Sequence, residues 1–393
     1  MKPLTEHTPR QGKTRLISGL SLLLILAILA GIYFYAHSAP EEIQTKPTEY
    51  AEYERGRVVE ILSDSCTPDP VAEGAERGEQ TLLVEVQTGQ YAGQTLLVTN
   101  AVGPIYAQRA QVGQGLTIII STYENGDYMA TVYEYDRSTA IYILIGLFIL
   151  VTLLVGGKTG ARSIAGLVLT VAALLTVLIP LLMKGWNTIL TTFLICALVT
   201  AACFVILGGV DRKMVCACLG TIAGMALAMV FGLLAQHMVK LDGLRSADAE
   251  ALLQLRQTGT PLGIRGLLVA GIIISAQGAV MDVAMSIASA ISELKTVNGS
   301  LTRRELWRSG MNIGRDMVGT MTNTLILAFL GSGFVLILYL WSLGLGYHQL
   351  MSSSYMGIEV VSGISSAIGV ILAVPMTCVL GAWMFGSKGK GEK

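Results

Sequence analysis

Acidic side chains inside apolar segments are the strongest candidates for chemistry in this sequence. Asp282 lies about four helical turns into an apolar run, counted from residue 266, and a charged side chain there costs about 2.5–3.5 kcal/mol on membrane-insertion scales. No neighbouring cation in the same helix offsets this cost. Helical spacing places Asp282 on one face with Gly278, Ser286, Ser289 and Glu293. The pattern favours a face that binds an ion, a proton or a small polar solute.

The next two apolar runs also carry polar faces. In the first, Arg315 is the natural counter-ion for an acid, and in the second Glu359 stands near the start, before Pro375, which is expected to kink the helix. Ser362, Gly363 and Ser366 share the face below Glu359. The candidate residues over all three runs are Asp282, Ser286, Ser289, Asn312, Arg315, Asp316, Thr320, Asn323 and Glu359.

Two interpretations of these faces remain open. In the functional one, they line a shared polar core, with Asp282 and Asp316 in its inner half and Glu359 near its outer mouth. In the structural one, the hydroxyl side chains form hydrogen bonds between helices, Asp316 and Arg315 lie at the inner interface, and Glu359 reaches lipid headgroups. The spacing favours function for Asp282 and packing for the serines and threonines.

Motifs for catalysis and cofactors are absent from the sequence. It contains no His-Glu-x-x-His, no Gly-x-x-x-x-Gly-Lys-Ser/Thr and no convincing Gly-x-Gly-x-x-Gly after a strand. Cys216-Ala217-Cys218 lacks the Cys-x-x-Cys spacing of a redox pair or zinc knuckle. We therefore expect no enzyme, no cofactor, no metal site and no ATP-driven step.

The composition places most of the chain in lipid. Hydrophobic residues make up 52% and charged residues 14% of the sequence, and the mean hydropathy is +0.61. A soluble domain usually carries about 25% charge. A membrane helix needs about 20 mostly apolar residues. Eight runs qualify: 16–36, 139–157, 161–183, 187–209, 213–237, 262–291, 318–342 and 357–386.

Lys and Arg indicate the orientation of these runs, because they concentrate on the cytoplasmic side. They cluster in 2–15, 158–162, 212–213, 295–315 and 388–393, which lie on one side if eight spans alternate. Both termini are then cytoplasmic. The first run could instead be a cleaved signal peptide, but its apolar core exceeds the usual 7–15 residues, which favours an uncleaved anchor in residues 1–37.

Residues 38–138 form the one large polar segment and are expected outside the cytoplasm, before a seven-span bundle in 139–393. Five β-rich runs, Arg57–Leu62, Gln80–Val86, Gln94–Thr99, Gly115–Ser121 and Tyr128–Tyr135, favour a small antiparallel barrel, for which an OB-like fold is one candidate. Asn125-Gly126-Asp127 predicts a hairpin turn. The segment lacks the basic stripe with interleaved aromatic residues that would suggest nucleic-acid binding. Cys66 has no cysteine partner on this side.

Three further patterns predict local structure. Gly220, Gly224, Ala228 and Gly232 form a small-residue stripe that lets helices pack closely. Residues 246–258 read as a short helix at the outer interface. Thr302 and Glu305 fit a capping box at the start of a basic amphipathic helix.

Two long motifs resemble the YibE/F family of bacterial multi-pass membrane proteins. They are the runs Gly278–Ser289 and Gly314–Ala328, supported by Glu359 followed by Gly369 and Pro375. The resemblance extends over most of the chain, including the anchor and the β-rich segment. It implies a bacterial plasma-membrane protein and brings no particular activity. The residues that match its motifs are Asp282, Arg315, Asp316, Asn323 and Glu359.

Two functions remain open from the sequence. The first is a secondary transporter, permease or channel for an ion or small polar solute, with the polar faces along its path. The second is a membrane scaffold or accessory subunit that recruits a membrane-protein partner through the β-rich domain. Either protein would have the lipid bilayer as its surroundings, and the glycine stripes would permit a homo-oligomer.

Overall fold

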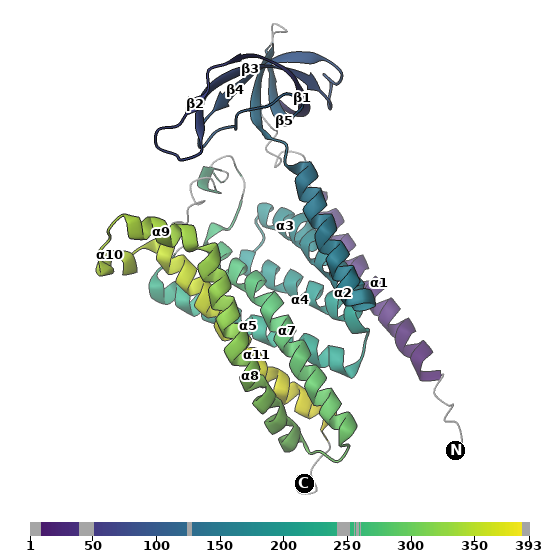
Figure 1. Ribbon diagram of the computed structural model, residues 1–393. Helices are drawn as coiled ribbons and strands as arrows, with labels where there is room; N and C mark the ends of the chain where they lie inside the picture. The colour runs from purple at the N-terminus through teal and green to yellow at the C-terminus, as the bar shows by residue number, and fades with distance from the viewer. Residues whose placement is uncertain are drawn as a thin grey trace. The chain divides into compact units, whose positions relative to one another are not determined.

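The computed structural model describes residues 9–38, 51–123, 128–241, 252–254, 256, 259 and 261–386 (Figure 1). The chain divides into two compact units, Gln44–Leu154 and the combination of Met1–Ile43 with Val155–Lys393. The predicted turn at 125–127 and most of the predicted helix at 246–258 lie outside the described residues.

The first unit is a β-barrel closed by five strands. Its strands are β1 (Ala51–Asp64), β2 (Thr67–Pro68), β3 (Glu76–Val86), β4 (Thr95–Val102), β5 (Gly115–Thr122) and β6 (Tyr128–Tyr135). The sheet runs β1-β5-β6-β4-β3-β2, and an additional pairing of β1 with β3 closes it. The predicted five-stranded barrel is therefore confirmed. Its expected antiparallel pairing is wrong at one place, where β4 pairs with β6 in parallel at Thr99 and Thr131.

β1 closes the barrel because it pairs with two strands in turn. Its first part, Ala51–Arg57, pairs with β5, and Gly56–Asp64 pairs with β3 across two register shifts. Gly56 belongs to both pairings, and a Cβ at this position would collide with Val84. Alternate side chains such as Leu82, Val98 and Ile118 are fully buried inside the barrel.

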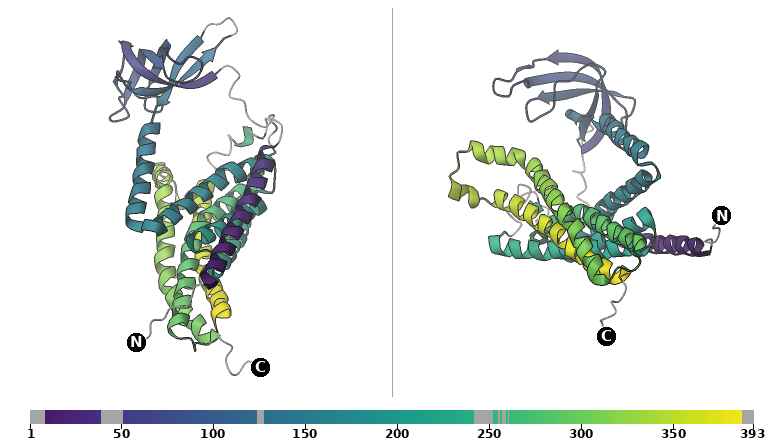
Figure 2. Two further views of the ribbon diagram at one scale, coloured as in Figure 1. Left: turned by 90° about the vertical axis from the view of Figure 1, so that its right-hand side faces the viewer. Right: turned by 60° about the horizontal axis from the view of Figure 1, so that its bottom comes forward.

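The second unit is built from helices of 5 to 32 residues (Figures 1 and 2). They are α1 (Pro9–His37), α3 (Ile179–Met183), α4 (Thr188–Gly208), α5 (Arg212–Val239), α7 (Leu267–Val297), α8 (Arg303–Ser332), α9 (Phe334–Ser342), α10 (Tyr347–Met351) and α11 (Ser354–Phe385). α2 (Ser138–Ala173) begins in the barrel unit and continues through a π-helical turn, Leu174–Leu178, into α3.

Six of the described helices are long and apolar enough to cross a membrane, or seven if the bent pair α8 and α9 counts as one span. The predicted spans 139–157 and 161–183 appear together as the 46-residue stretch Ser138–Met183, whose backbone leaves the helical conformation at Gly157 (φ 53°). A helix of that length would extend about 69 Å, more than twice the thickness of a hydrocarbon core. The number of eight spans stays a prediction.

The centre of the helical unit is a crossing of α5 and α11. All four members of the predicted small-residue stripe on α5 are buried, which confirms its role in packing. A Cβ added to Gly369 of α11 would lie 2.5 Å from Ala228 Cβ and 3.2 Å from the carbonyl oxygen of Gly224. The two helices therefore pack closely, with nothing larger than a methyl group between them at this point. α7 packs against both helices, and α8 packs against α7 and α11.

The start of α8 follows the predicted capping box. Thr302 N donates to Glu305 Oε2 over 2.8 Å, and Glu305 N donates to Thr302 Oγ1 over 3.4 Å. Pro375 lies inside α11, which stays helical from Ser354 to Phe385.

Candidate functional site

The predicted polar face of α7 is exposed in the single chain. Between residues 271 and 293, the exposed residues are Gly271, Gly278, Asp282, Ser286 and Glu293, while Ser289 is half-buried. None of the exposed residues in this stretch is a large apolar one. The opposite side of α7 is the buried side that packs into the core. α7 thus differs from α4 and α11, which expose large apolar residues such as Leu194 and Trp383.

α8 presents a second polar surface over residues 308–324. Its exposed positions there are Arg308, Asn312, Arg315, Asp316, Gly319, Thr320, Asn323 and Thr324. Gly310 and Gly314 lie on the other side of the helix and are buried. Large apolar side chains return to the exposed surface only at Ile326.

The two polar surfaces lie in register along the antiparallel pair α7 and α8. A Cβ on Gly310 would lie 2.9 Å from Ile291 Cδ1, and one on Gly314 would lie 3.5 Å from Ile287 Cδ1. Because the two helices are antiparallel, each step back along α7 from these contacts corresponds to one step forward along α8. This counting places polar residues of the two helices at the same height along the pair. The matched pairs are Asp282 with Gly319, Ser286 with Arg315, Ser289 with Asn312 and Glu293 with Arg308. We call the exposed residues of 271–293 and 308–324 the α7–α8 polar face.

Charged groups of this face have no polar partner within the described part of the chain. No hydrogen bond or ion pair joins Asp282, Arg315 or Asp316 to another described side chain. Thr320 and Thr324 donate only to carbonyl groups of their own helix. The face is thus open, and its charged groups are free to interact with something outside the single chain.

Glu359 lies apart from this face, at a break between two helices. α8 ends at Ser332 and α9 starts at Phe334, with a bend of 57°. A Cβ on the intervening Gly333 would lie 3.5 Å from Glu359 Oε2. Gly319 lies at the same level along the helix pair as Asp282, and Gly333 follows Gly319 by 14 residues. At the rise of an α-helix, this separates Gly333 from the level of Asp282 by about 20 Å. The structure therefore places Asp282 and Asp316 at neighbouring levels and Glu359 far from both.

Hydroxyl and amide groups other than those of Ser286 and Ser289 link the helices. Ser366 of α11 and Ser275 of α7 are 2.8 Å apart between their Oγ atoms. Gln277 of α7 donates to Thr200 Oγ1 of α4 over 3.1 Å and to the carbonyl of Cys196 over 3.3 Å. Gln277 was not among the residues predicted from the sequence, although an amide in an otherwise apolar run was a usable signal.

No group of three or more His, Cys, Asp or Glu side chains that could hold a metal ion occurs within the described ranges. Any cation at the α7–α8 polar face would thus need further ligands, from water or from another chain.

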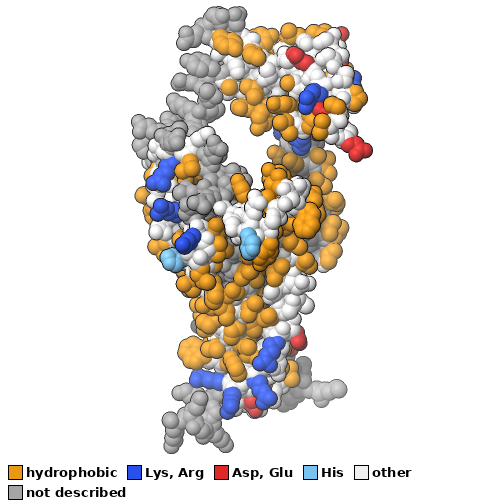
Figure 3. Space-filling model, turned by 90° about the vertical axis from the view of Figure 1, so that its left-hand side faces the viewer, with side chains coloured by type: hydrophobic (Ala, Val, Ile, Leu, Met, Phe, Trp, Pro, Cys, Tyr) orange, Lys and Arg blue, Asp and Glu red, His pale blue; other side chains and the backbone are white. Residues whose placement is uncertain are grey.

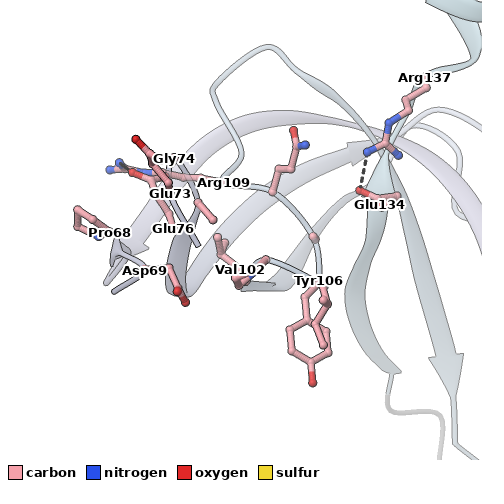
Figure 4. A pocket seen from close by; sticks show the side chains of 16 residues that line it. Pro68, Asp69, Glu73, Gly74, Glu76, Val102, Tyr106, Arg109, Glu134 and Arg137 are labelled. Atoms are coloured by element: carbon pink, nitrogen blue, oxygen red, sulfur yellow. Dashed lines mark hydrogen bonds and ion pairs between the residues drawn. The ribbon is translucent and has the colours of Figure 1, made fainter. Parts of the chain in front are cut away.

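The barrel unit has an open cleft of about 900 Å³ between the β1–β3 loop and the β4–β5 connection (Figure 4). Arg109 of the β4–β5 connection joins the two walls through ion pairs with Asp64 (2.8 Å) and Glu76 (3.0 Å). Ile105 and Tyr106 of the same connection are 85% and 67% exposed. This cleft was not predictable from the sequence, because the two loops that form it carry no motif.

Cys66 lies in the β1–β3 loop beside Asp64. Burial, together with the Asp64 carboxylate, raises the pKa of this thiol from 9.0 to about 11. The pKa of Asp64 is held well below its usual range, chiefly because its carboxylate accepts a hydrogen bond from the Cys66 backbone N–H. Cys66 is thus a poor nucleophile at neutral pH.

The comparisons with known proteins point to one family. No curated protein and no solved structure matches the chain. The family described as YibE/F-like protein matches residues 144–387, more than half of the chain and all of α4 to α11. The match starts after the barrel, so it does not include the anchor and β-rich segment that the resemblance was expected to cover. On this match, the chain belongs to the YibE/F-like protein family.

Proposed function

We propose that the protein is embedded in a bacterial plasma membrane, with both termini in the cytoplasm and the barrel outside. Family membership and the long apolar helices support a membrane protein. Figure 3 supports this location, because the helical part shows a broad apolar surface with Lys and Arg side chains below it and a second group of them above it. Such a distribution is typical of a bilayer span flanked by positive residues.

Within that membrane, the protein is a secondary transporter, permease or channel for an ion or small polar solute. The observation that supports this function best is the α7–α8 polar face. On α8 it extends over residues 308–324, about 24 Å along the helix, from the cytoplasmic end into the predicted span 318–342. Polar faces on membrane helices usually line a water-filled path or a protein interior.

The chemistry of the face favours a proton or a cation. Asp282 and Asp316 supply carboxylate oxygens at neighbouring levels, and hard cations prefer such ligands. Arg315 adds one positive charge, which can compensate one of the two carboxylates when the path is empty. Glu359, beside the break between α8 and α9, is a second candidate position nearer the outer end. Broken helices at such positions bind substrates in several transporter folds.

Neutralising the two aspartates should abolish flux. We expect Asp282→Asn and Asp316→Asn, reconstituted as full-length chains in proteoliposomes, to lower proton- or cation-dependent uptake at least about tenfold, because each removes a charge from the path. Asp282→Glu keeps the charge and should retain measurable flux. Glu60→Gln, an exposed position on the barrel, is the matched control and should transport like the native chain. Native flux unchanged in both Asn variants would refute the assignment.

A second function, partner recruitment by the barrel, is favoured by a separate observation. Its strand order, β1-β3-β4-β6-β5-β1 with one parallel contact, is the order of an OB barrel. In OB barrels the loop between the first and second barrel strands commonly contributes to ligand binding. The equivalent loop here borders the cleft and exposes Val71 (91%). Exposed apolar residues around a polar cleft are typical of protein interaction sites.

Crosslinking distinguishes recruitment from transport. A photoreactive residue at position 105 should capture a protein in cells if the cleft binds a partner, and Tyr106→Ser should reduce that capture. The same photoreactive residue at the exposed Glu60 is the control. Equal labelling from positions 105 and 60 would argue against recruitment through this cleft.

A further inference from the structure

We propose that the α7–α8 polar face binds the same face of a second copy of this chain, so that the working unit is a two-fold symmetric dimer. The inference rests on the proposed membrane location and deepens the proposed function, because the second copy supplies the missing wall of the path. The proposed contact surface consists only of the exposed residues of 271–293 and 308–324.

The first argument is the chemistry of the exposed surface. In a single chain, Asp282 would point into lipid, which is unfavourable for a carboxylate. The other four charged residues of the face, Glu293, Arg308, Arg315 and Asp316, continue it toward the cytoplasmic end of the two predicted spans. Large apolar side chains, which lipid solvates well, are exposed on α4, α5 and α11 but are lacking on this face. The face is therefore built to be covered by protein and water.

The second argument is the room for another helix. Gly271, Gly278 and Gly319 are exposed, and an added Cβ at any of them would meet nothing within 4 Å. The buried glycines of α5 and α11, in contrast, already serve contacts inside the chain. Glycines on an outer face let the backbone of a neighbouring helix approach closely.

The third argument is charge complementarity, which selects a second copy as the partner. Two copies inserted in the same direction are related by an axis along the membrane normal, so residues of equal level meet. Glu293 is level with Arg308, and the adjacent Arg315 and Asp316 lie at the level of Ser286. Each arginine can therefore pair with an acid of the other copy. At the level of Asp282, the two copies bring two carboxylates together without an arginine, where a cation or proton would balance them.

Cysteine crosslinking tests the contact directly. Ser286→Cys is introduced into the full-length chain with Cys66→Ser, and Leu194→Cys, 56% exposed on α4, is the matched control. In native membranes, oxidation should convert Ser286→Cys into a covalent dimer of twice the chain mass, while Leu194→Cys stays monomeric. Crosslinking that is no greater at position 286 than at position 194, or a product with a different protein, would overturn the second copy as partner.

A charge exchange tests the complementarity. Arg315→Asp places acids opposite acids and should weaken dimerisation in lipid nanodiscs at least about tenfold, because like charges then meet. The double variant Arg315→Asp/Asp316→Arg should restore it, which a folding defect could not do. A native chain that is monomeric in nanodiscs would overturn the dimer. A dimer without flux would instead refute only the proposed transport.

Discussion

Replacing Gly369 with leucine should destabilise the helical unit more than any other single glycine substitution in α11. A Cβ at this position would lie 2.5 Å from Ala228 Cβ and 3.3 Å from Ala228 Cα. Because backbone atoms and a methyl group cannot turn aside, α5 and α11 would have to separate. Overpacking of this kind costs about 3 kcal/mol or more, which corresponds to a fall in the melting temperature of about 6–12 °C.

Tryptophan fluorescence in detergent measures this change selectively. All four tryptophans, Trp186, Trp307, Trp341 and Trp383, belong to the helical unit. Gly31→Leu is the control, because Gly31 is exposed on α1 and an added Cβ there meets nothing within 4 Å. Equal melting temperatures for the two variants would show that the α5–α11 crossing tolerates a side chain.

Replacing Gln80 with leucine should unfold the barrel while leaving the helical unit intact. Gln80 is fully buried, and its amide makes four hydrogen bonds. Its Nε2 donates to Asp64 (2.9 Å) and to the Ala110 carbonyl (3.2 Å), and its Oε1 accepts from Asn100 Nδ2 (3.0 Å) and Ala110 N (2.8 Å). Leucine leaves these buried partners unsatisfied at about 1–3 kcal/mol each, so we expect a total loss of about 3 kcal/mol or more.

Alkylation of Cys66 reports the state of the barrel, because it is the one cysteine in that unit's sequence. The pKa of its thiol is about 11 in the folded barrel and should return toward 9.0 on unfolding. At pH 8 the reactive thiolate fraction then rises about a hundredfold, so Cys66 should label much faster in the Gln80→Leu chain. Gln87→Leu, at an exposed position, should label at the native rate. If labelling of Cys66 is equally slow in Gln80→Leu, the amide network does not hold the barrel.

The sequence predicted much of the helical unit because periodicity states which residues share a side of a helix. The stripe containing Asp282 and the capping box of Thr302 follow directly from spacing. Periodicity does not predict whether such a stripe packs against another helix or is exposed. The outward position of the α7–α8 polar face depends on contacts such as Gly310 with Ile291, which join distant segments and leave no local signal.

Two further features depended on long-range geometry. The break before Phe334 occurs at Gly333, one of several glycines in this region, and the sequence alone does not distinguish it from Gly331. In the barrel, strand positions were predictable from β-rich runs. The double pairing of β1 was not, because it requires Gly56 to meet Val84 of a distant strand.

The close contact of Gly224 and Gly369 also has a consequence for motion. Because only methyl groups separate the two helices at this contact and they are closely packed, α5 and α11 should move as one rigid body. Any conformational change would then be confined to their neighbours. The joint between α8 and α9 at Gly333, where the two helices already bend by 57°, is the natural hinge for such a movement.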